Sequence, residues 1–141
     1  YLNGNGIVTA NNMFSGWVAW GNRTSAYPGN TDVKDVFIPV RRMFNFISIQ
    51  LAKTFWQRID FPLNRRQIDT VLDSANILLN GYTSKGYILG GRVEFLESEN
   101  TTTDLMDGKA VFHVYITPPS PNREIDFVLE YDTSYLQTLF A

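Results

Sequence analysis

The sequence predicts an α+β fold in which two packed helices lie against a small, mostly antiparallel sheet, followed by an extended carboxy-terminal arm. Two observations predict this class. Apolar residues recur every three or four positions through residues 36–82, and every second position in three segments between residues 92 and 131. The first spacing puts apolar side chains on one face of a helix, and the second puts them on one face of a strand. We therefore expect a helical layer and a separate sheet layer.

Residues 1–35 are predicted to form a lead-in region of loops with one or two short strands. Glycine and asparagine are frequent there, and both favour turns that need a positive φ angle. Short apolar runs at residues 7–8 and 17–20 indicate brief strands between the turns. Pro28-Gly29 marks another turn, and Thr31 or Asp32 is a suitable amino-terminal cap for the next element.

The longest helical segment is residues 36–60, VFIPVRRMFNFISIQLAKTFWQRID. Its apolar stripe is too broad for a solvated surface helix, so we expect the rest of the domain or other copies of the protein to cover it. Pro39 is tolerated in a first turn, which places the start near residues 38–40, with residues 36–38 extended before it. Pro62 disfavours helix at Phe61, so the helix should end near Asp60. The stripe consists of Val40, Phe44, Ile47, Leu51 and Phe55, and it is widened by Met43, Phe46, Trp56 and Ile59.

A second helix is predicted to begin after Asn64. Asn64 is a good amino-terminal cap, Gln67 occupies the matching capping-box position, and Gly81 or Gly86 ends the helix. The link to the first helix is short, so the two helices should form a hairpin or a sharp corner. The apolar face of this helix consists of Ile68, Val71, Leu72, Ala75, Leu78, Leu79 and Tyr82.

Three strands are predicted after the helices, around residues 92–95, 110–117 and 124–131. The polar stretch 97–107 between the first two reads as a loop that ends in an Asp107-Gly108 turn. Residues 36–117 should therefore form the helix-helix-sheet core. Residues 118–141 should form an arm made of a proline connector, the third strand and an apolar tail.

The third predicted strand has no later segment with which to pair. It can close the sheet of its own domain, or it can add to the sheet of another subunit through main-chain hydrogen bonds. The alternation of residues 124–131 does not decide between these two arrangements.

Composition excludes several classes of protein. The net charge of −2 argues against a general binder of nucleic acid or anionic membranes. The chain has no cysteine, which excludes disulfides and thiolate zinc sites and fits a reducing cytoplasm or a particle assembled there. No run of about 20 apolar residues occurs. The chain begins with Tyr1 in a Gly/Asn-rich turn, so we expect it to be a fragment of a longer polypeptide.

No motif for catalysis, metal binding or cofactor binding is found. His113 is the single histidine and lies in an alternating strand, so we expect an ordinary sheet residue and not a catalytic group. The acidic residues of the 97–107 loop lack the register of a calcium-binding loop, and the glycines match no phosphate-binding pattern. We predict a protein that is not an enzyme and has no cofactor.

Two arginine pairs, Arg41-Arg42 and Arg65-Arg66, lie at the predicted starts of the two helices, where positive charge is mildly unfavourable. They can contact nucleic-acid phosphate, pair with carboxylates of a neighbouring segment or subunit, or simply be solvated. Because the 14 acidic residues outnumber the 12 basic ones, we favour ion pairing.

Four sequence blocks together resemble the carboxy-terminal region of contractile phage tail sheath proteins, especially those of Mu-like and P2-like phages and prophages. The blocks are WGNRT at residues 20–24, IPVRRMFNFI at 38–47, ANILLNGYTSKGYILGGRVEF at 75–95 and VYITPPSPNREIDFVLEYD at 114–132. They occur in the same order as in that family and cover nearly the whole chain.

The resemblance implies a structural subunit of the virion, assembled in the host cytoplasm, that polymerises around a tail tube. On contraction the sheath rearranges and drives the tube into the host. The implied partners are other copies of the protein, the tail tube protein, and baseplate and tail terminator proteins, with no nucleic acid and no membrane. The sheath of a phage-derived bacteriocin or another contractile injection system is the alternative, and a nucleic-acid-binding module is the alternative from another class.

In sheath proteins, terminal arms of one subunit augment a sheet in its neighbours, so the resemblance implies that residues 123–131 link subunits. We predict a subunit interface formed by the arginine pairs and by the apolar side chains of the arm. The residues are Arg41, Arg42, Arg65, Arg66, Ile125, Phe127, Leu129, Tyr131, Leu136 and Phe140.

Overall fold

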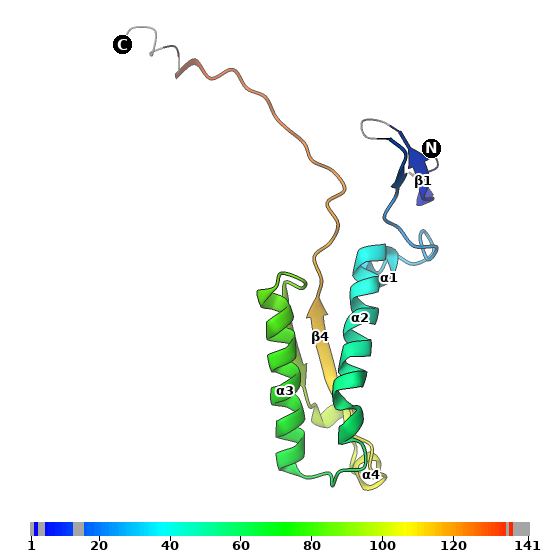
Figure 1. The fold of residues 1–141 in the computed structure, drawn as a ribbon, viewed down its shortest axis with the longest axis vertical. Coiled ribbons are helices and arrows are strands. Elements are labelled where there is room, and N and C mark those ends of the chain that lie inside the picture. Colours follow the sequence, from blue (N-terminus) through cyan, green and yellow to red (C-terminus); the bar gives the residue numbers. More distant parts are fainter. Residues whose placement is uncertain (1, 3–4, 13–15, 135, 137–141) are drawn as a thin grey trace.

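The computed structural model describes residues 2, 5–12, 16–134 and 136 of the 141-residue chain. The described part contains an amino-terminal β-hairpin, two long helices, a second β-hairpin and a long extended carboxy-terminal segment (Figure 1). This confirms the α+β class. No helix in the described ranges is long and apolar enough to cross a membrane.

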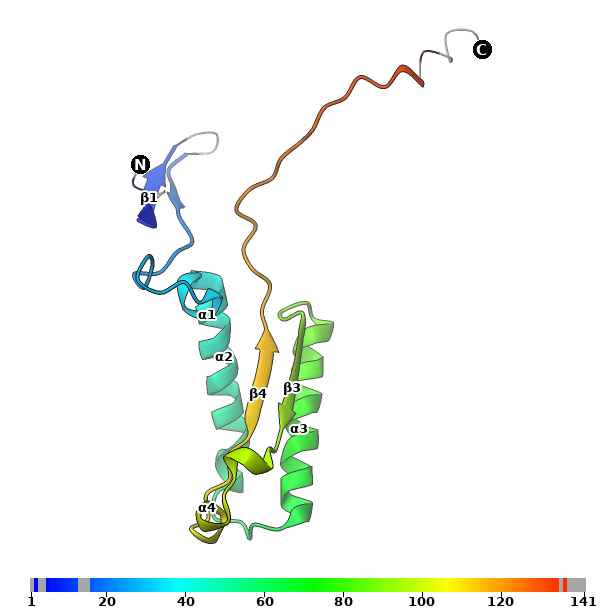
Figure 2. The same ribbon diagram turned by 180° about the vertical axis from the view of Figure 1, so that it is seen from behind.

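Two antiparallel helices and one hairpin form the core. Helix α2 (Ile38–Phe55) and helix α3 (Arg65–Ser84) run in opposite directions, and strands β3 (Gly90–Glu94) and β4 (His113–Thr117) pack against them (Figures 1 and 2). The two strands are antiparallel, with Val93 opposite Val114. Side chains from both helices and from β3 build one buried cluster, Ile47, Ala75, Leu79, Tyr82, Ile88 and Val93.

The ends of α3 follow the sequence signals. The side-chain oxygen of Asn64 accepts a hydrogen bond from the backbone N–H of Gln67 at 2.9 Å, which satisfies one of the free donors of the first turn. Gly86 follows the helix with a φ of +75°, a conformation that favours glycine. Both signals were predicted, and the observed helix begins at Arg65 directly after its cap.

Helix α2 is shorter than the sequence predicts. It ends at Phe55, and a 3-10 turn over Trp56–Arg58 follows, whereas the predicted end was near Asp60. Asp60 has a φ of +72°, which lies outside the helical region and reverses the chain before Pro62. The chain therefore leaves the helix ahead of the residue that the proline rule identifies.

A short helix precedes α2. Helix α1 (Val33–Val36) is capped by Asp32, whose side chain accepts a hydrogen bond from the backbone N–H of Lys34 at 3.0 Å. Asp32 is one of the two residues predicted as a cap. Phe37 is extended between the two helices and forms an isolated bridge with Arg23. Residues 36–38 were predicted to be extended, but Val36 belongs to α1 and Ile38 to α2.

The amino-terminal strands are β1 (Thr9–Asn11) and β2 (Val18–Trp20), which pair antiparallel. Strand β2 lies where a strand was predicted, while β1 begins just after the predicted Ile7-Val8 run. Gly21 follows β2 with a φ of +143°, and a Cβ there would lie 3.0 Å from the Cα of Val8. A larger residue at position 21 is therefore excluded by both conformation and space.

The loop predicted for residues 97–107 contains two helical turns, a 3-10 turn over Glu97–Glu99 and helix α4 (Thr102–Met106). Thr101 caps α4 by accepting from the N–H of Asp104 at 3.2 Å. A helix this short shows no apolar period, so the sequence pattern missed it. The predicted turn at Asp107-Gly108 is present, and Gly108 has a φ of +76°.

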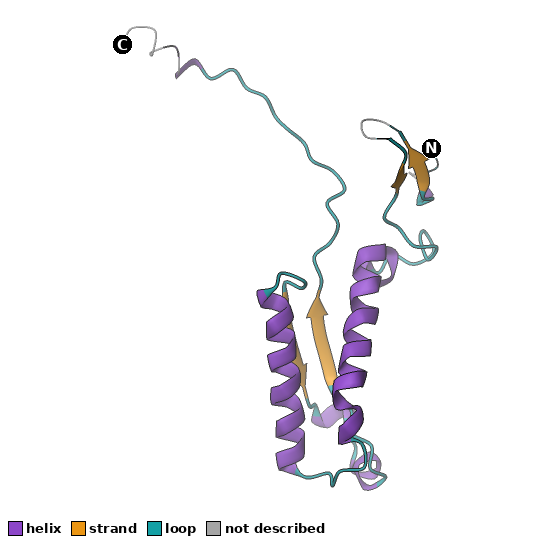
Figure 3. Ribbon diagram, in the orientation of Figure 1, coloured by secondary structure: helices purple, strands orange, loops and turns teal. Residues whose placement is uncertain are grey.

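The predicted strand at residues 124–131 does not pair within the described chain. Residues 118–132 form no strand and run away from the core beyond the carboxy end of β4 (Figures 1 and 3). Pro118 and Pro119 follow β4 directly, lack backbone N–H groups and favour extended conformations, so the chain does not turn back onto β4. The sheet of the core is a two-stranded hairpin, not three strands.

Leu79→Ala should lower the free energy of unfolding by about 2–5 kcal/mol, because this side chain is fully buried between α3 and the hairpin. Ile77 on the same helix is 71% exposed, so Ile77→Ala should change it by less than about 0.5 kcal/mol. Chemical denaturation followed by circular dichroism measures both variants. Equal effects would contradict the arrangement of the layers.

Candidate subunit interface

The carboxy-terminal arm presents apolar side chains to solvent. Phe127 is 84% exposed and Leu129 is 93% exposed, and Ile125 and Tyr131 are also exposed. Leu136, the last described residue, is exposed, and Phe140 lies outside the described residues. Contiguous exposed apolar surface of this kind marks binding sites in soluble proteins.

The outer edge of β3 is closed at Val93 by a side chain of α3. The amide of Asn76 accepts a hydrogen bond from the N–H of Val93 at 2.9 Å and donates one to its carbonyl at 3.4 Å. Asn76 thus takes the place that a neighbouring strand would occupy at this position. Because both backbone groups of Val93 point at Asn76, they point away from β4.

The outer edge of β4 is open. Val93 lies opposite Val114, and Gly91 lies opposite Ile116. In an antiparallel pair, opposite residues that do not bond to each other both direct their backbone groups outward. Val114 and Ile116 therefore direct their N–H and carbonyl groups away from β3, and no described residue forms a hydrogen bond with them on that side.

A second asparagine closes the base of the hairpin. Asn100 is buried, and its side chain accepts from the N–H of Val111 at 2.7 Å. It also donates to the carbonyls of Val111 and Leu96, at 2.9 Å and 2.8 Å. The chain just before β4 is therefore held in place although it has no strand partner there.

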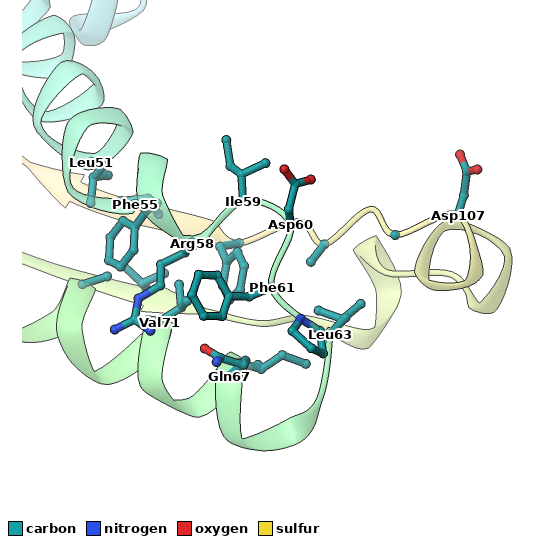
Figure 4. A pocket seen from close by; sticks show the side chains of 18 residues that line it. Leu51, Phe55, Arg58, Ile59, Asp60, Phe61, Leu63, Gln67, Val71 and Asp107 are labelled. Carbon is teal, nitrogen blue, oxygen red and sulfur yellow. The ribbon is translucent and has the colours of Figure 1, made fainter.

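An apolar groove of about 740 Å³ lies beside the amino-terminal end of β4 (Figure 4). Its walls come from the end of α2, the link 56–64, the start of α3 and residues 107–114. Phe55, Phe61 and Val71 lie close together on this wall, and the carboxylate of Asp60 points away from them (Figure 4). Val114 belongs both to the open edge and to the groove lining.

In each arginine pair, one side chain forms an ion pair with a described residue and the other does not. Arg41 pairs with Asp35 at 2.9 Å and Arg65 with Asp69 at 3.1 Å, each within the chain. Arg42 and Arg66 form no ion pair with any described residue. Exposed pairs of this kind contribute less than about 1 kcal/mol each. Whether the four arginines contact another subunit stays a prediction.

The outer face of the hairpin is polar. The ring nitrogen Nδ1 of His113 lies 2.7 Å from Glu99, and its ring stacks on Tyr115 with centroids 4.4 Å apart. The guanidinium of Arg92 lies 4.1 Å from the ring centre of Tyr115 and pairs with Glu94 at 2.7 Å. His113 is thus held by its sheet neighbours, in agreement with the interpretation of a sheet histidine.

One carboxylate in the arm has a shifted pKa. The hydroxyl and the backbone N–H of Ser134 both donate to Asp132, at 2.6 Å and 2.9 Å, and they hold the pKa of Asp132 below its ordinary value. The turn at this end of the arm is therefore stabilised above the ordinary pKa of aspartate, and that stabilisation is lost as the pH falls through the lowered value. Among the described residues, no group of three or more acidic, histidine or cysteine side chains could hold a metal ion.

Two curated proteins are similar in sequence to nearly the whole of this chain. Over 139 residues, or 98% of the chain, 31% of residues are identical to the tail sheath protein of Burkholderia phage BcepMu. This chain is therefore similar in sequence to a phage tail sheath protein. The major tail sheath protein of Serratia phage KSP20 is 26% identical over 141 residues. No family model matches the sequence.

The chain spans about a third of the length of these two relatives. It covers 29% of the BcepMu protein and 34% of the KSP20 protein. Its placement in the carboxy-terminal region of a sheath protein stays a prediction.

Solved structures share the fold. A chain in the anti-feeding prophage baseplate has a TM-score of 0.80 and 22% identity, with 94% of this chain and 38% of that chain covered. A chain in the contracted sheath complex of an extracellular contractile injection system, PVC, has a TM-score of 0.77 and 21% identity. The structural match covers 96% of the present chain and 39% of the PVC chain.

Sequence reasoning missed the parts of this surface that depend on tertiary structure. Asn76 and Asn100 looked like ordinary polar residues, because only the fold brings them to the backbone of Val93 and Val111. The groove is assembled from several separate segments, Val93 of β3 among them, and no spacing in the sequence indicates it. The exposed residues of the arm were found from their alternation.

Asn76→Ala should lower the free energy of unfolding by about 1–3 kcal/mol, because the backbone groups of Val93 lose their partner in a half-buried site. Asn80 lies one turn later on the exposed face of α3, so Asn80→Ala is the matched control and should be nearly neutral. Urea denaturation measures both. A neutral Asn76→Ala would show that the edge of β3 does not need this side chain.

Proposed function

We propose that this chain is part of a structural subunit of a contractile phage tail sheath. The subunit polymerises around a tail tube and rearranges on contraction to drive the tube into the host. It is a component of the virion, assembled in the host cytoplasm, and its activity is mechanical and not catalytic. Other copies of itself, the tube protein, and baseplate and tail terminator proteins are its partners. The relationship to two phage tail sheath proteins supports this proposal.

The single observation that carries the proposal is the combination of an unpaired arm with an open strand edge. The arm has the alternation of a strand but no partner in the described chain, while β4 has outward backbone groups without partners. The arm lacks a neighbouring strand, and the edge of β4 lacks one too, so the two can pair with each other. Adding a strand to an exposed edge supplies affinity through main-chain hydrogen bonds.

Pairing between copies is favoured over pairing within one chain. The arm begins at the carboxy end of β4, and Pro118 and Pro119 keep it extended in the direction away from the core (Figure 1). To pair with its own β4 it would need a tight turn at that point. An arm that continues outward instead meets the edge of an adjoining subunit.

A subunit with one donor arm and one acceptor edge forms head-to-tail contacts. Such contacts close into rings or continue as helical polymers, depending on the rotation between successive copies. Both forms suit a sheath around a tube. We assign residues 1–35 to the lead-in, 36–117 to the acceptor core and 118–141 to the donor arm.

The free arginines complete the proposed interface. Arg42 and Arg66 are exposed near the starts of α2 and α3, which lie at opposite ends of the two antiparallel helices, so each can pair with a carboxylate on a different part of a neighbouring subunit. An arginine fork pairs well with a carboxylate. Arg41 and Arg65, which already hold Asp35 and Asp69, then position the helix ends more than they bind the partner.

The sheath of a phage-derived bacteriocin or another contractile injection system is the second candidate. The fold shared with chains of the anti-feeding prophage and PVC particles supports it. The acceptor core and the donor arm serve either particle in the same way.

Deleting residues 123–141 from the protein at its full natural length should abolish the formation of tubes or rings, because the donor strand is lost. The helical signal in circular dichroism should remain, since α2 and α3 do not contact the arm. Negative-stain imaging and sedimentation measure assembly. A truncated protein that still forms tubes of uniform diameter would contradict arm exchange as the linking device.

A further inference from the structure

We propose that the apolar groove beside β4 receives the odd-numbered side chains of the arm of a second copy, Ile125, Phe127, Leu129 and Tyr131. This inference rests on the proposed function and adds to it the face of the arm that is buried and the surface that buries it. The groove thereby fixes the register parity of the added strand.

The groove and the open edge form one continuous surface. Val114 lines the groove with its side chain and directs its backbone groups to the open edge. Phe112 lies in the same groove and, with Val114, packs against the buried cluster, which places both side chains on the face of the hairpin covered by the helices. A strand added at this edge extends that face directly over the groove.

The geometry of pairing selects one face of the arm. Alternate side chains of an added strand point to the same side as Val114, and the intervening ones point to the polar outer face with His113 and Tyr115. The side chains that face the groove are therefore either those of the odd-numbered residues of the arm or those of the even-numbered residues, with no intermediate arrangement.

The two faces of the arm differ sharply in chemistry. The odd-numbered face is apolar throughout, whereas the even-numbered face is Glu124, Asp126, Val128 and Glu130. Burying a carboxylate against Phe55, Phe61 and Val71 is costly, and Arg58 is the single basic side chain in the groove lining that could pair with one. A slip of one residue would bury three carboxylates at once. One arginine cannot pair with three carboxylates, so the groove favours the odd-numbered set.

The occupant comes from another copy because of where the groove lies. Its lining includes Ala110 and Phe112, which precede β4. The arm leaves from the opposite end of that strand (Figure 1). The arm of the same chain points away from its own groove. The same arm reaches outward to the groove of an adjoining copy.

Two neighbouring residues of the arm provide a matched test. Leu129 and Val128 are 93% and 84% exposed in the subunit, so neither substitution should affect its folding. In the full-length protein, Leu129→Ser should raise the concentration needed for tube assembly by roughly tenfold or more, because an apolar side chain is lost from the groove. Val128→Ser should leave it nearly unchanged, although valine has the stronger preference for strands.

A crosslinking measurement locates the contact. A photoreactive phenylalanine analogue at position 127 should crosslink between copies to peptides of the groove, within residues 51–75 and 107–114. The same analogue at position 128 should not react with those peptides. Reaction of position 127 with a different component of the particle, or equal reaction of both positions with the groove, would overturn the inference.

The outcome separates this inference from the proposed function. If deletion of the arm abolishes assembly but Leu129→Ser and Val128→Ser act equally, arm exchange stands and the groove is not its receptor. If the deletion leaves tubes intact, the proposed linking device itself fails.

Discussion

The constraint on which this structure depends is that a two-stranded hairpin has two outer edges and cannot satisfy both by itself. Each edge carries N–H and carbonyl groups that lose free energy if they are buried without partners. At Val93 the protein satisfies the edge of β3 internally, with the side chain of Asn76 on α3. No described residue satisfies the outward backbone groups of Val114 and Ile116 on β4. The asymmetry of the subunit follows from this difference.

The remaining features of the chain are consistent with that asymmetry. The helices cover the apolar face of the hairpin and bury Leu79 and Ile47 completely, so the core does not depend on the missing strand. The groove next to β4 is the part of that apolar face that the helices leave uncovered. The arm carries the apolar surface that matches it, and proline residues hold the arm away from its own core. The donor and the acceptor are thus kept apart within one molecule.

The sequence predicted the features that depend on neighbouring residues and missed those that depend on distant ones. The cap at Asn64, the stop at Gly86 and the apolar stripes follow from local chemistry, and the structure confirms them. The alternation of residues 124–131 predicted a strand, but the described chain forms none there, and no pattern within one chain shows whether such a segment pairs within it or with another chain. Helix α4 is too short to show a period, and the end of α2 depends on the backbone conformation of Asp60. The two edge-closing asparagines became recognisable only when the fold brought them to the strands.

The proline connector also sets a geometric limit on the particle. Residues 118–123 separate the end of β4 from the start of the alternating segment, and an extended chain of that length reaches about 20 Å. If arms are exchanged as proposed, the receiving strand of one protomer lies within this radius of the last residue of β4 in the protomer before it, in every state of the assembly. The connector has few backbone donors, so a change in its direction breaks few hydrogen bonds. It can therefore act as a tether of fixed length and variable angle, permitting large rotations between protomers while forbidding large separations.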